Sequence, residues 1–463
     1  MAKRNRTKLY FAAYFLMFFL ALGTRWINKE FNIAEIAPVL MTVLAGADIG
    51  DWNLAFAFMR KVVLLSAVLA WLAAMLGRRT GRPRAALGAI SVLFAAIAVC
   101  FGIMLYGIPE NRGFFAPVSQ FYEENYTDPR DAGIEFAQKR SVVILQLESM
   151  EASYADEKLW GRNLIPGLSR LARENISFAL FASGRGTNNT VMALAGATCG
   201  VPLTFSGKIE WAAMKMLRGA KCIGDILAEN GYENRLFMSG KASFSSIDDL
   251  FLGHGFSRAV DMRSLERSGI KPAWRWGADD ADLAAAIKPE IEELAASGRP
   301  YAAFVSFMNT HNPKGLLSSR CDGDPDDFRD IAACNDKIAA EFIEWLRSTD
   351  PDAAIVVFGD HAAYPNGLEG ILGGLSERPL LNIIINGPKV PVNGLNRRFL
   401  AYDLMPTIVE LAGGRWGGGR LGIGTSLYSG KKTLLETTDF DKLQTEQTAP
   451  NKLYGKLMLG DGK

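Results

Sequence analysis

The sequence has little net charge, few histidines and few cysteines. Its 51 basic and 49 acidic residues leave a formal charge of +2, which does not imply a general surface for polyanions. No basic stripe with interleaved aromatic residues is present, so nucleic-acid binding is not expected, and no internal repeat is visible. With three histidines and five cysteines in 463 residues, each one can be considered individually.

Long apolar runs are concentrated in the first 108 residues. Uncharged runs of 16, 16 and 25 residues lie at 9–24, 62–77 and 85–109. A membrane-spanning helix needs about 20 apolar residues, with slack because charged ends can reach the interface. We therefore predict three spans, with the 12 uncharged residues at 36–47 forming an interfacial or re-entrant segment. The first run could be a signal peptide, but the later spans favour an uncleaved anchor.

Positive charges predict the orientation of this anchor. Basic residues cluster before the first span and before the third: Lys3, Arg4, Arg6 and Lys8, then Arg78, Arg79, Arg82 and Arg84. Both clusters should be cytoplasmic, which places the rest of the chain outside. We predict a multi-pass inner-membrane protein with an anchor at 1–108, a juxtamembrane linker at 109–140, a periplasmic or otherwise extracytoplasmic catalytic domain at 141–430 and a polar tail at 431–463.

Four cysteines follow the predicted spans: Cys199, Cys222, Cys321 and Cys334. An even set in an oxidising compartment favours two disulfides. Three pairings are possible, and closeness in sequence favours Cys199 with Cys222 and Cys321 with Cys334. Four buried thiols are the alternative.

The outer part of the chain alternates between two kinds of pattern. Short, nearly continuous apolar runs are typical of strands buried on both faces, and they occur at 141–147, 235–238, 301–308, 353–358 and 380–385. Helical patterns lie between them at 166–174, 222–230, 280–297 and 331–347. This alternation predicts an α/β fold with a mostly parallel sheet between helices.

Polar residues follow four of these predicted strands. In parallel sheets ligands bind beyond the carboxyl ends of the strands. Those ends carry Glu148, the run 239–241, the run 309–313 with His311, and Asp360-His361. A carboxylate and an imidazole from one tight turn make half of a metal site, and Glu148 could be a third ligand. Either carboxylate taken alone could instead be a structural cap.

A glycine-flanked turn at 183–190 runs into an apolar helical pattern at 191–197. The hydroxyl of Thr187 would lie at the positive end of a helix dipole, where a phosphate is favoured. The alternative is that Thr187 or Thr190 is an ordinary N-cap. As a fourth metal ligand, Thr187 would lose its proton more easily and become a nucleophile.

An ordered set of short motifs resembles one enzyme family. The motifs are Leu147-Glu148-Ser149, Gly186-Thr187-Asn188-Asn189-Thr190, 197–203, 221–227, 253–256, Trp276-Gly277, 310–313, Gly359-Asp360-His361 and 403–407. The set, over roughly residues 140 to 428, resembles the phosphoglycerol transferases that decorate osmoregulated periplasmic glucans. These enzymes belong to the sulfatase-like branch of the alkaline phosphatase superfamily, and lipoteichoic acid synthases are close relatives.

The resemblance implies a role for each matched residue. Thr187 would take up phosphoglycerol covalently, and Glu148, Thr187, Asp360 and His361 would hold one divalent cation. Manganese is expected, although magnesium or zinc would suit the same ligands. His311 would contact substrate and move a proton.

Three further residues are candidate substrate contacts. The planar fork of Arg185 matches phosphate oxygens, and Lys241 could meet a phosphate or simply be solvated. Trp276 is the third. His254, between glycines in a predicted turn, is expected to be structural.

Some positions depart from the family pattern. Ser239 stands where lipoteichoic acid synthases have a histidine, which argues against glycerophosphate polymerisation. The sulfatase nucleophile pattern, Cys or Ser before x-Pro-x-Arg, is absent around Thr187, which argues against sulfate-ester hydrolysis.

The resemblance implies transfer of phosphoglycerol from phosphatidylglycerol to an envelope glycan. A phosphoethanolamine transferase and a non-catalytic glycan or lipid receptor are the alternatives.

Overall fold

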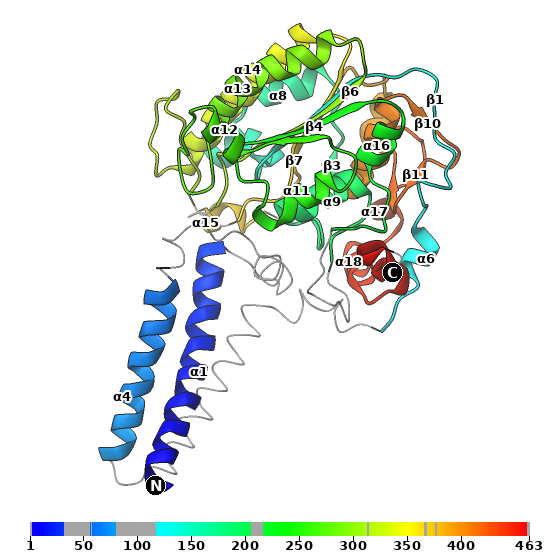
Figure 1. Cartoon of the computed structure of the whole chain (residues 1–463). Helices are drawn as coiled ribbons and strands as arrows, with labels where there is room; N and C mark the ends of the chain where they lie inside the picture. The colour runs from blue at the N-terminus through cyan, green and yellow to red at the C-terminus, as the bar shows by residue number, and fades with distance from the viewer. Residues whose placement is uncertain are drawn as a thin grey trace. The chain divides into compact units, whose positions relative to one another are not determined.

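The computed structural model describes residues 2–31, 56, 58–79, 117–204, 216–312, 314–364, 368–375 and 377–460 (Figure 1). The chain divides into two compact units, Met1–Arg112 and Gly113–Lys463. In the first unit, α1 (Ala2–Phe31) packs against α4 (Leu65–Arg79), which continues from the π-helix η1 (Met59–Leu64). Tyr14 of α1 and Ala70 of α4 are buried in this contact.

The predicted spans at 9–24 and 62–77 fall within α1 and within η1 and α4. Over the described residues, no helix combines the length and the apolar character that crossing a membrane requires. The predicted span at 85–109, the segment at 36–47 and Cys100 lie outside the described residues.

The second unit is built on a six-stranded sheet whose order is β5-β4-β6-β2-β7-β8. The strands are β5 (Arg258–Val260), β4 (Glu233–Met238), β6 (Tyr301–Phe307), β2 (Val142–Leu147), β7 (Ala354–Gly359) and β8 (Asn382–Ile385). All pairs are parallel except β7 with β8. The prediction of a mostly parallel sheet is therefore confirmed. The direction of β8 and the three-residue β5 were not foreseen, because an apolar run does not reveal strand direction.

Helices cover both faces of this sheet. One face packs Val143, Leu145 and Leu147 against α8 (Pro166–Glu174), α12 (Met262–Arg267), α13 (Asp280–Ala296) and α14 (Phe328–Thr349). On the other face, Phe304 contacts Phe251 of α11 (Ile247–Leu252). Figure 1 shows α9 (Thr190–Cys199) and α16 (Leu404–Leu411) on the side of the sheet opposite α13 and α14.

The four predicted helices all form, as α8, α10 (Ile223–Glu229), α13 and α14. The remaining elements are short. The strands are β1 (Glu135–Phe136), β3 (Leu180–Phe181), β9 (Arg398–Phe399), β10 (Gly414–Arg415), β11 (Arg420–Leu421) and β12 (Gly424–Thr425), and the helices include α6 (Phe121–Asn125), α7 (Glu157–Trp160) and α15 (Glu369–Leu372). The 3-10 turns are η3 (Ala152–Ala155), η5 (Phe244–Ser246), η6 (Val392–Leu395) and η7 (Ala401–Asp403).

Residues 431–463 differ from the polar tail that we predict from the sequence. They contain α17 (Leu434–Thr437), α18 (Phe440–Thr448) and α19 (Lys452–Leu459). Leu443 is fully buried and Tyr454 nearly so. Hydrophobic periodicity does not predict α18, because the buried face of this helix includes two glutamines.

The first described residues of the second unit pack against this C-terminal segment. The amide of Ser119 donates to the carbonyl of Pro450 across 2.8 Å, and Asn451 Nδ2 donates to the carbonyl of Ser119 across 2.7 Å. The rings of Tyr122 in α6 and Tyr454 in α19 lie 4.9 Å apart. Part of the predicted linker is thus integral to the second unit.

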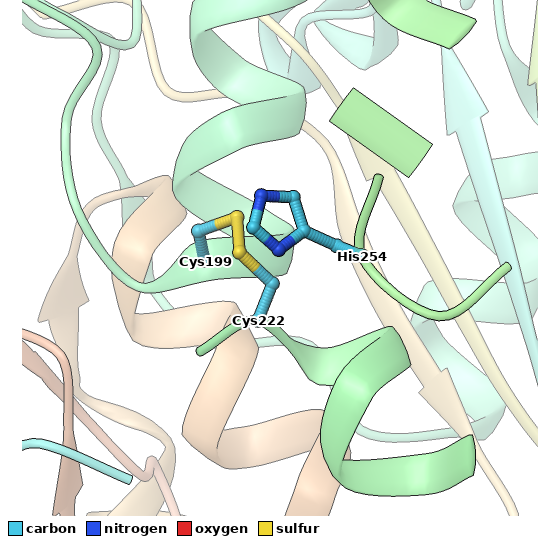
Figure 2. A group of neighbouring side chains, drawn as sticks. All are labelled: Cys199, Cys222 and His254. Carbon is cyan, nitrogen blue, oxygen red and sulfur yellow. A yellow bond between two sulfur atoms is a disulfide. The ribbon is translucent and has the colours of Figure 1, made fainter. Parts of the chain in front are cut away.

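Both predicted disulfides are present, Cys199–Cys222 and Cys321–Cys334. Figure 2 shows His254 beside the Cys199–Cys222 bond, which joins the end of α9 to the start of α10. His254 Nδ1 lies 2.9 Å from Asp225 Oδ2 and Nε2 lies 3.0 Å from the carbonyl of Met216. With both sulfurs bonded to each other and both ring nitrogens in hydrogen bonds, this cluster is structural.

Candidate active site

Glu148, Asp360 and His361 form a buried cluster at the carboxyl edge of the sheet. Glu148 directly follows β2 and Asp360-His361 follow β7, and the two strands are parallel neighbours. His361 Nε2 lies 3.1 Å from Glu148 Oε1 and 3.6 Å from Asp360 Oδ2. Each of the three residues is at most 2% exposed. The structure therefore brings together the three side chains that the sequence predicts at the ends of two strands.

The donor atoms of this cluster fit a divalent cation. One ligand atom from each residue lies within 4.8 Å of the others. Asp360 Oδ1 accepts from the amides of Ser149 (2.8 Å) and His361 (2.9 Å), whereas the buried Oδ2 has no hydrogen-bond partner among the described residues. Two carboxylates and one imidazole suit manganese, magnesium or zinc.

Burial and proximity shift the protonation of all three groups. Burial and the charge of Glu148 raise the pKa of Asp360 to about 7. Burial opposes protonation of His361, but the two carboxylates raise the pKa of His361 to about 10. Burial also opposes ionisation of Glu148, yet the histidines His311 and His361 lower the pKa of Glu148 to about 2. These shifts show that the closely spaced carboxylates favour a positive charge beside them. A site that binds a cation has the same electrostatic property.

Thr187 lies in a tight turn ahead of α9. Gly186 has a φ of +75°, and a Cβ there would lie 2.7 Å from Pro202 Cβ, so both the turn and the close approach require glycine. Thr187 Oγ1 donates to the carbonyl of Gly184 across 3.0 Å. Thr187 is 1% exposed.

Neither Thr187 nor Thr190 caps α9, so the cap interpretation is wrong for both. The N-cap is Asn189, which has extended backbone angles and accepts from the amide of Met192 across 3.1 Å. Thr190 is the first helical residue, and its Oγ1 donates to Glu148 Oε2 across 3.1 Å. The Thr190 hydroxyl, one of the two cap candidates, instead orients a metal-ligand candidate.

A second link ties the Thr187 turn to His361. The hydroxyl of Tyr364 donates to the carbonyl of Asn188 across 2.9 Å, and the Tyr364 ring lies 5.2 Å from that of His361. Tyr364 belongs to none of the motifs above, and Thr190 stands in one of them only as a cap candidate, so the sequence does not predict either contact.

His311 and Trp276 lie together beyond β6. Their ring centroids are 4.4 Å apart, and Arg275 lies over the Trp276 ring at 4.9 Å. His311 Nδ1 lies 2.7 Å from the carbonyl of Asn312, so Nδ1 carries the proton and Nε2 the lone pair when the ring is neutral. Burial lowers the pKa of His311, which favours that neutral form.

Lys241 begins the loop that lies against Trp276. Gly240 pairs with Gly277, and the ring of Phe244 lies 5.4 Å from that of Trp276. Lys241 is half-buried in this loop, and Arg185 is half-buried in the Thr187 turn. The structure places both on the loops of the carboxyl edge.

Asp280 is a structural residue of the site that we did not identify from the sequence. Its buried carboxylate accepts from Ser239 Oγ and the amide of Met308, both at 2.8 Å, and from the amide of Asn309 at 2.7 Å. These bonds hold the ends of β4 and β6 in place. Ser239 is thus a hydrogen-bond partner of Asp280.

A family model described as Sulfatase matches residues 140–414, which is more than half of the chain. The chain belongs to the sulfatase family. This sulfatase-family chain is 28% identical over 405 residues to "Phosphoglycerol transferase I" of Xanthomonas euvesicatoria pv. vesicatoria (strain 85-10), covering 83% of this chain and 56% of that protein. It is 29% identical over 307 residues to the protein of the same name from Escherichia coli O127:H6, covering 63% and 39%. The chain spans about half the length of these curated relatives, or less.

A solved structure supports the same fold. The sulfatase-family domain resembles a protein in the alkaline phosphatase superfamily from Vibrio parahaemolyticus, with a TM-score of 0.54 and 20% identity. The match covers 70% of this chain and 81% of that one. The family model thus confirms the predicted sulfatase membership, and the solved structure confirms the fold.

Proposed function

We propose that this protein transfers phosphoglycerol from phosphatidylglycerol to a glycan of the cell envelope, through a covalent phosphoglyceryl-threonine at Thr187. The observation that carries the proposal is the buried cluster of Glu148, Asp360 and His361 tied by Thr190 to the turn that holds Thr187. The similarity to proteins named phosphoglycerol transferase I supports the choice of headgroup.

In the first half of the reaction, Thr187 Oγ attacks the phosphorus of the donor, and the bond from phosphorus to the diacylglycerol oxygen breaks. Diacylglycerol leaves with a proton, and phosphoglycerol remains on Thr187. A divalent cation held by Glu148, Asp360, His361 and Thr187 would favour the ionised hydroxyl and offset phosphoryl charge. Gly184 orients the Thr187 hydroxyl, and Arg185 is a candidate contact for phosphoryl oxygens.

In the second half, a sugar hydroxyl attacks the phosphorus and the bond to Thr187 Oγ breaks, which regenerates the enzyme. A base must take the proton of the incoming hydroxyl. His311 is suited to this because its Nδ1–H is held by the Asn312 carbonyl, which leaves Nε2 as the acceptor. Trp276 and Lys241 lie on the loops around this position and are candidate substrate contacts.

We further propose that the catalytic unit is extracytoplasmic and that the N-terminal unit anchors it to the inner membrane. A lipid donor keeps its chains in the bilayer, so an anchored site would meet it at the interface. The two disulfides are in keeping with an oxidising compartment. Activity of a C-terminally fused reporter that works only in the cytoplasm would contradict this placement.

Intact-mass measurement after incubation with lipid vesicles tests the reaction. The full chain with Mn²⁺ and phosphatidylglycerol should gain one phosphoglyceryl group, and Thr187→Ala should gain none while melting at the wild-type temperature. A phosphoethanolamine adduct from phosphatidylethanolamine would support the rival headgroup. No adduct with either lipid and with Mn²⁺, Mg²⁺ or Zn²⁺ would favour a receptor.

A further inference from the structure

Helix α18 lies directly against the turn that carries Thr187. Two of its side chains, Gln444 and Gln447, are three residues apart and are 3% and 0% exposed. Gln444 Oε1 accepts from the amide of Arg185, and Gln447 Nε2 donates to the carbonyl of the same residue across 2.6 Å. Arg185 is thus held on both of its backbone groups by one face of α18.

The same contact reaches Thr187 through Gly184. A Cβ on Gly184 would lie 2.7 Å from Gln444 Oε1, so a larger residue there would displace the Gln444 side chain from the turn. The carbonyl of Gly184 accepts from both the amide of Thr187 (2.9 Å) and its hydroxyl (3.0 Å). The position of Gly184 against α18 therefore determines where the Thr187 hydroxyl points.

Helix α18 is itself firmly anchored. The carbonyl of Gln447 accepts from the hydroxyl of Tyr122 across 2.8 Å, and Gln447 Oε1 lies 3.4 Å from the hydroxyl of Tyr402. Tyr454, which contacts the Tyr122 ring, accepts from the amide of Thr204 across 2.7 Å. These bonds join α18 to α6 and to η7, and they join α19 to the segment after α9.

Neutral amides suit this position chemically. A phosphodiester donor brings a negative charge to Thr187, so a carboxylate behind the turn would repel it, and a lysine would compete for its oxygens. A glutamine offers both a donor and an acceptor without a charge. It can hold the backbone of the turn and leave the electrostatics to the cation site.

We propose that Gln444 and Gln447 are positioning residues that fix the nucleophile turn from the C-terminal helix. The inference rests on the proposed role of Thr187 as nucleophile. It assigns a catalytic purpose to a segment whose composition resembles a tail.

The test uses the full chain and two isosteric changes, Gln444→Met and Gln447→Met, which keep side-chain length and remove the bonds to Arg185. Glu446→Gln, on the same helix, is the matched control. The first measurement is the rate of adduct formation on vesicles of phosphatidylglycerol with Mn²⁺. If the nucleophile is displaced, the rate of adduct formation should fall on the order of 10- to 100-fold at saturating donor. The donor concentration that gives half the maximal rate should change little.

The second measurement is hydrogen exchange of the peptide containing residues 183–190, which does not depend on any substrate. It should exchange faster in both methionine variants and remain unchanged in Glu446→Gln. If one methionine variant unfolds, the other decides the test. Gln444→Glu is a further control, since a carboxylate oxygen still accepts from the Arg185 amide and should protect the peptide as wild type does.

Unchanged exchange and unchanged adduct rate in the folded methionine variants would overturn the inference. If the wild-type chain forms no adduct, the proposed function fails, whereas the exchange measurement still decides whether α18 orders the turn.

Discussion

Thr190 Oγ1 donates a hydrogen bond to Glu148 Oε2 across 3.1 Å, joining the first turn of α9 to the end of β2. The two residues are 42 positions apart, and the bond links the segment after the Thr187 turn to the carboxylate cluster. It leaves Glu148 Oε1 facing His361. A hydrogen bond that orients a metal ligand commonly affects both metal affinity and activity.

Removing that hydroxyl should weaken metal binding. Thr190→Val keeps the shape of the side chain but frees Glu148 Oε2, so we expect Mn²⁺ affinity to fall about 10- to 100-fold. Thr190→Ser restores the donor and should recover most of the loss. Titration calorimetry on both variants is the measurement, and equal affinity in Thr190→Val and wild type would contradict the assigned role.

Metal removal should lower thermal stability, because only the folded chain assembles the cluster. At a Mn²⁺ concentration about 100 times Kd, binding contributes about 2.7 kcal/mol. Adding Mn²⁺ to EDTA-treated protein should therefore raise the unfolding midpoint by several degrees. Asp360→Asn should melt at one temperature with or without Mn²⁺, and an undiminished metal response in it would exclude this cluster as the site.

The low-pH limb of the pH–rate profile should report the protonation of His311. Burial lowers its pKa below the ordinary 6.5, and only the neutral ring can accept a proton at Nε2. As pH falls, the neutral form persists until the lowered pKa is passed, so the rate should decline with a midpoint below 6.5. His311→Gln should lose about 10²- to 10⁴-fold in rate and lose this limb. A pH profile of kcat/KM with its acid midpoint above 6.5 would speak against His311 as the base.

The two disulfides should contribute unequally to stability. Cys199–Cys222 closes 23 residues and both of its cysteines are buried, whereas Cys321–Cys334 closes 13 residues and Cys321 is half-buried. A disulfide typically stabilises by about 2–4 kcal/mol, more for longer loops. Replacing Cys199 and Cys222 together by alanine should lower the unfolding midpoint more than the same change at Cys321 and Cys334. The reverse order in calorimetry would show that local packing outweighs loop length.

Strand ends could be predicted well because they rest on local patterns. An apolar run that stops at an acidic residue or a histidine marks both the strand and the edge where ligands bind, which is how Glu148, Asp360 and His361 were found together. The disulfide pairing followed from short separations in sequence.

Contacts between distant segments could not be predicted in the same way. The bond from Thr190 to Glu148 depends on the angle at which α9 leaves its turn, and a threonine at a helix start reads equally well as a cap. Gln444 lies 259 residues from Arg185 and belongs to a short polar helix. Polar side chains that are buried and hydrogen-bonded produce no hydrophobic periodicity. The sequence pattern therefore predicts a tail where the structure has helices.

The hydrogen bonds of Ser119 with Pro450 and Asn451 limit where a fragment of the second unit can begin and end. A soluble fragment that begins at the first core strand, near residue 141, would discard α6 and expose the faces of Gln447 and Tyr454 that Tyr122 covers. One that stops near residue 430 would discard α18 and leave Arg185 without its two glutamine partners. A fragment for crystallisation or assay should therefore begin before Ser119 and continue beyond α19.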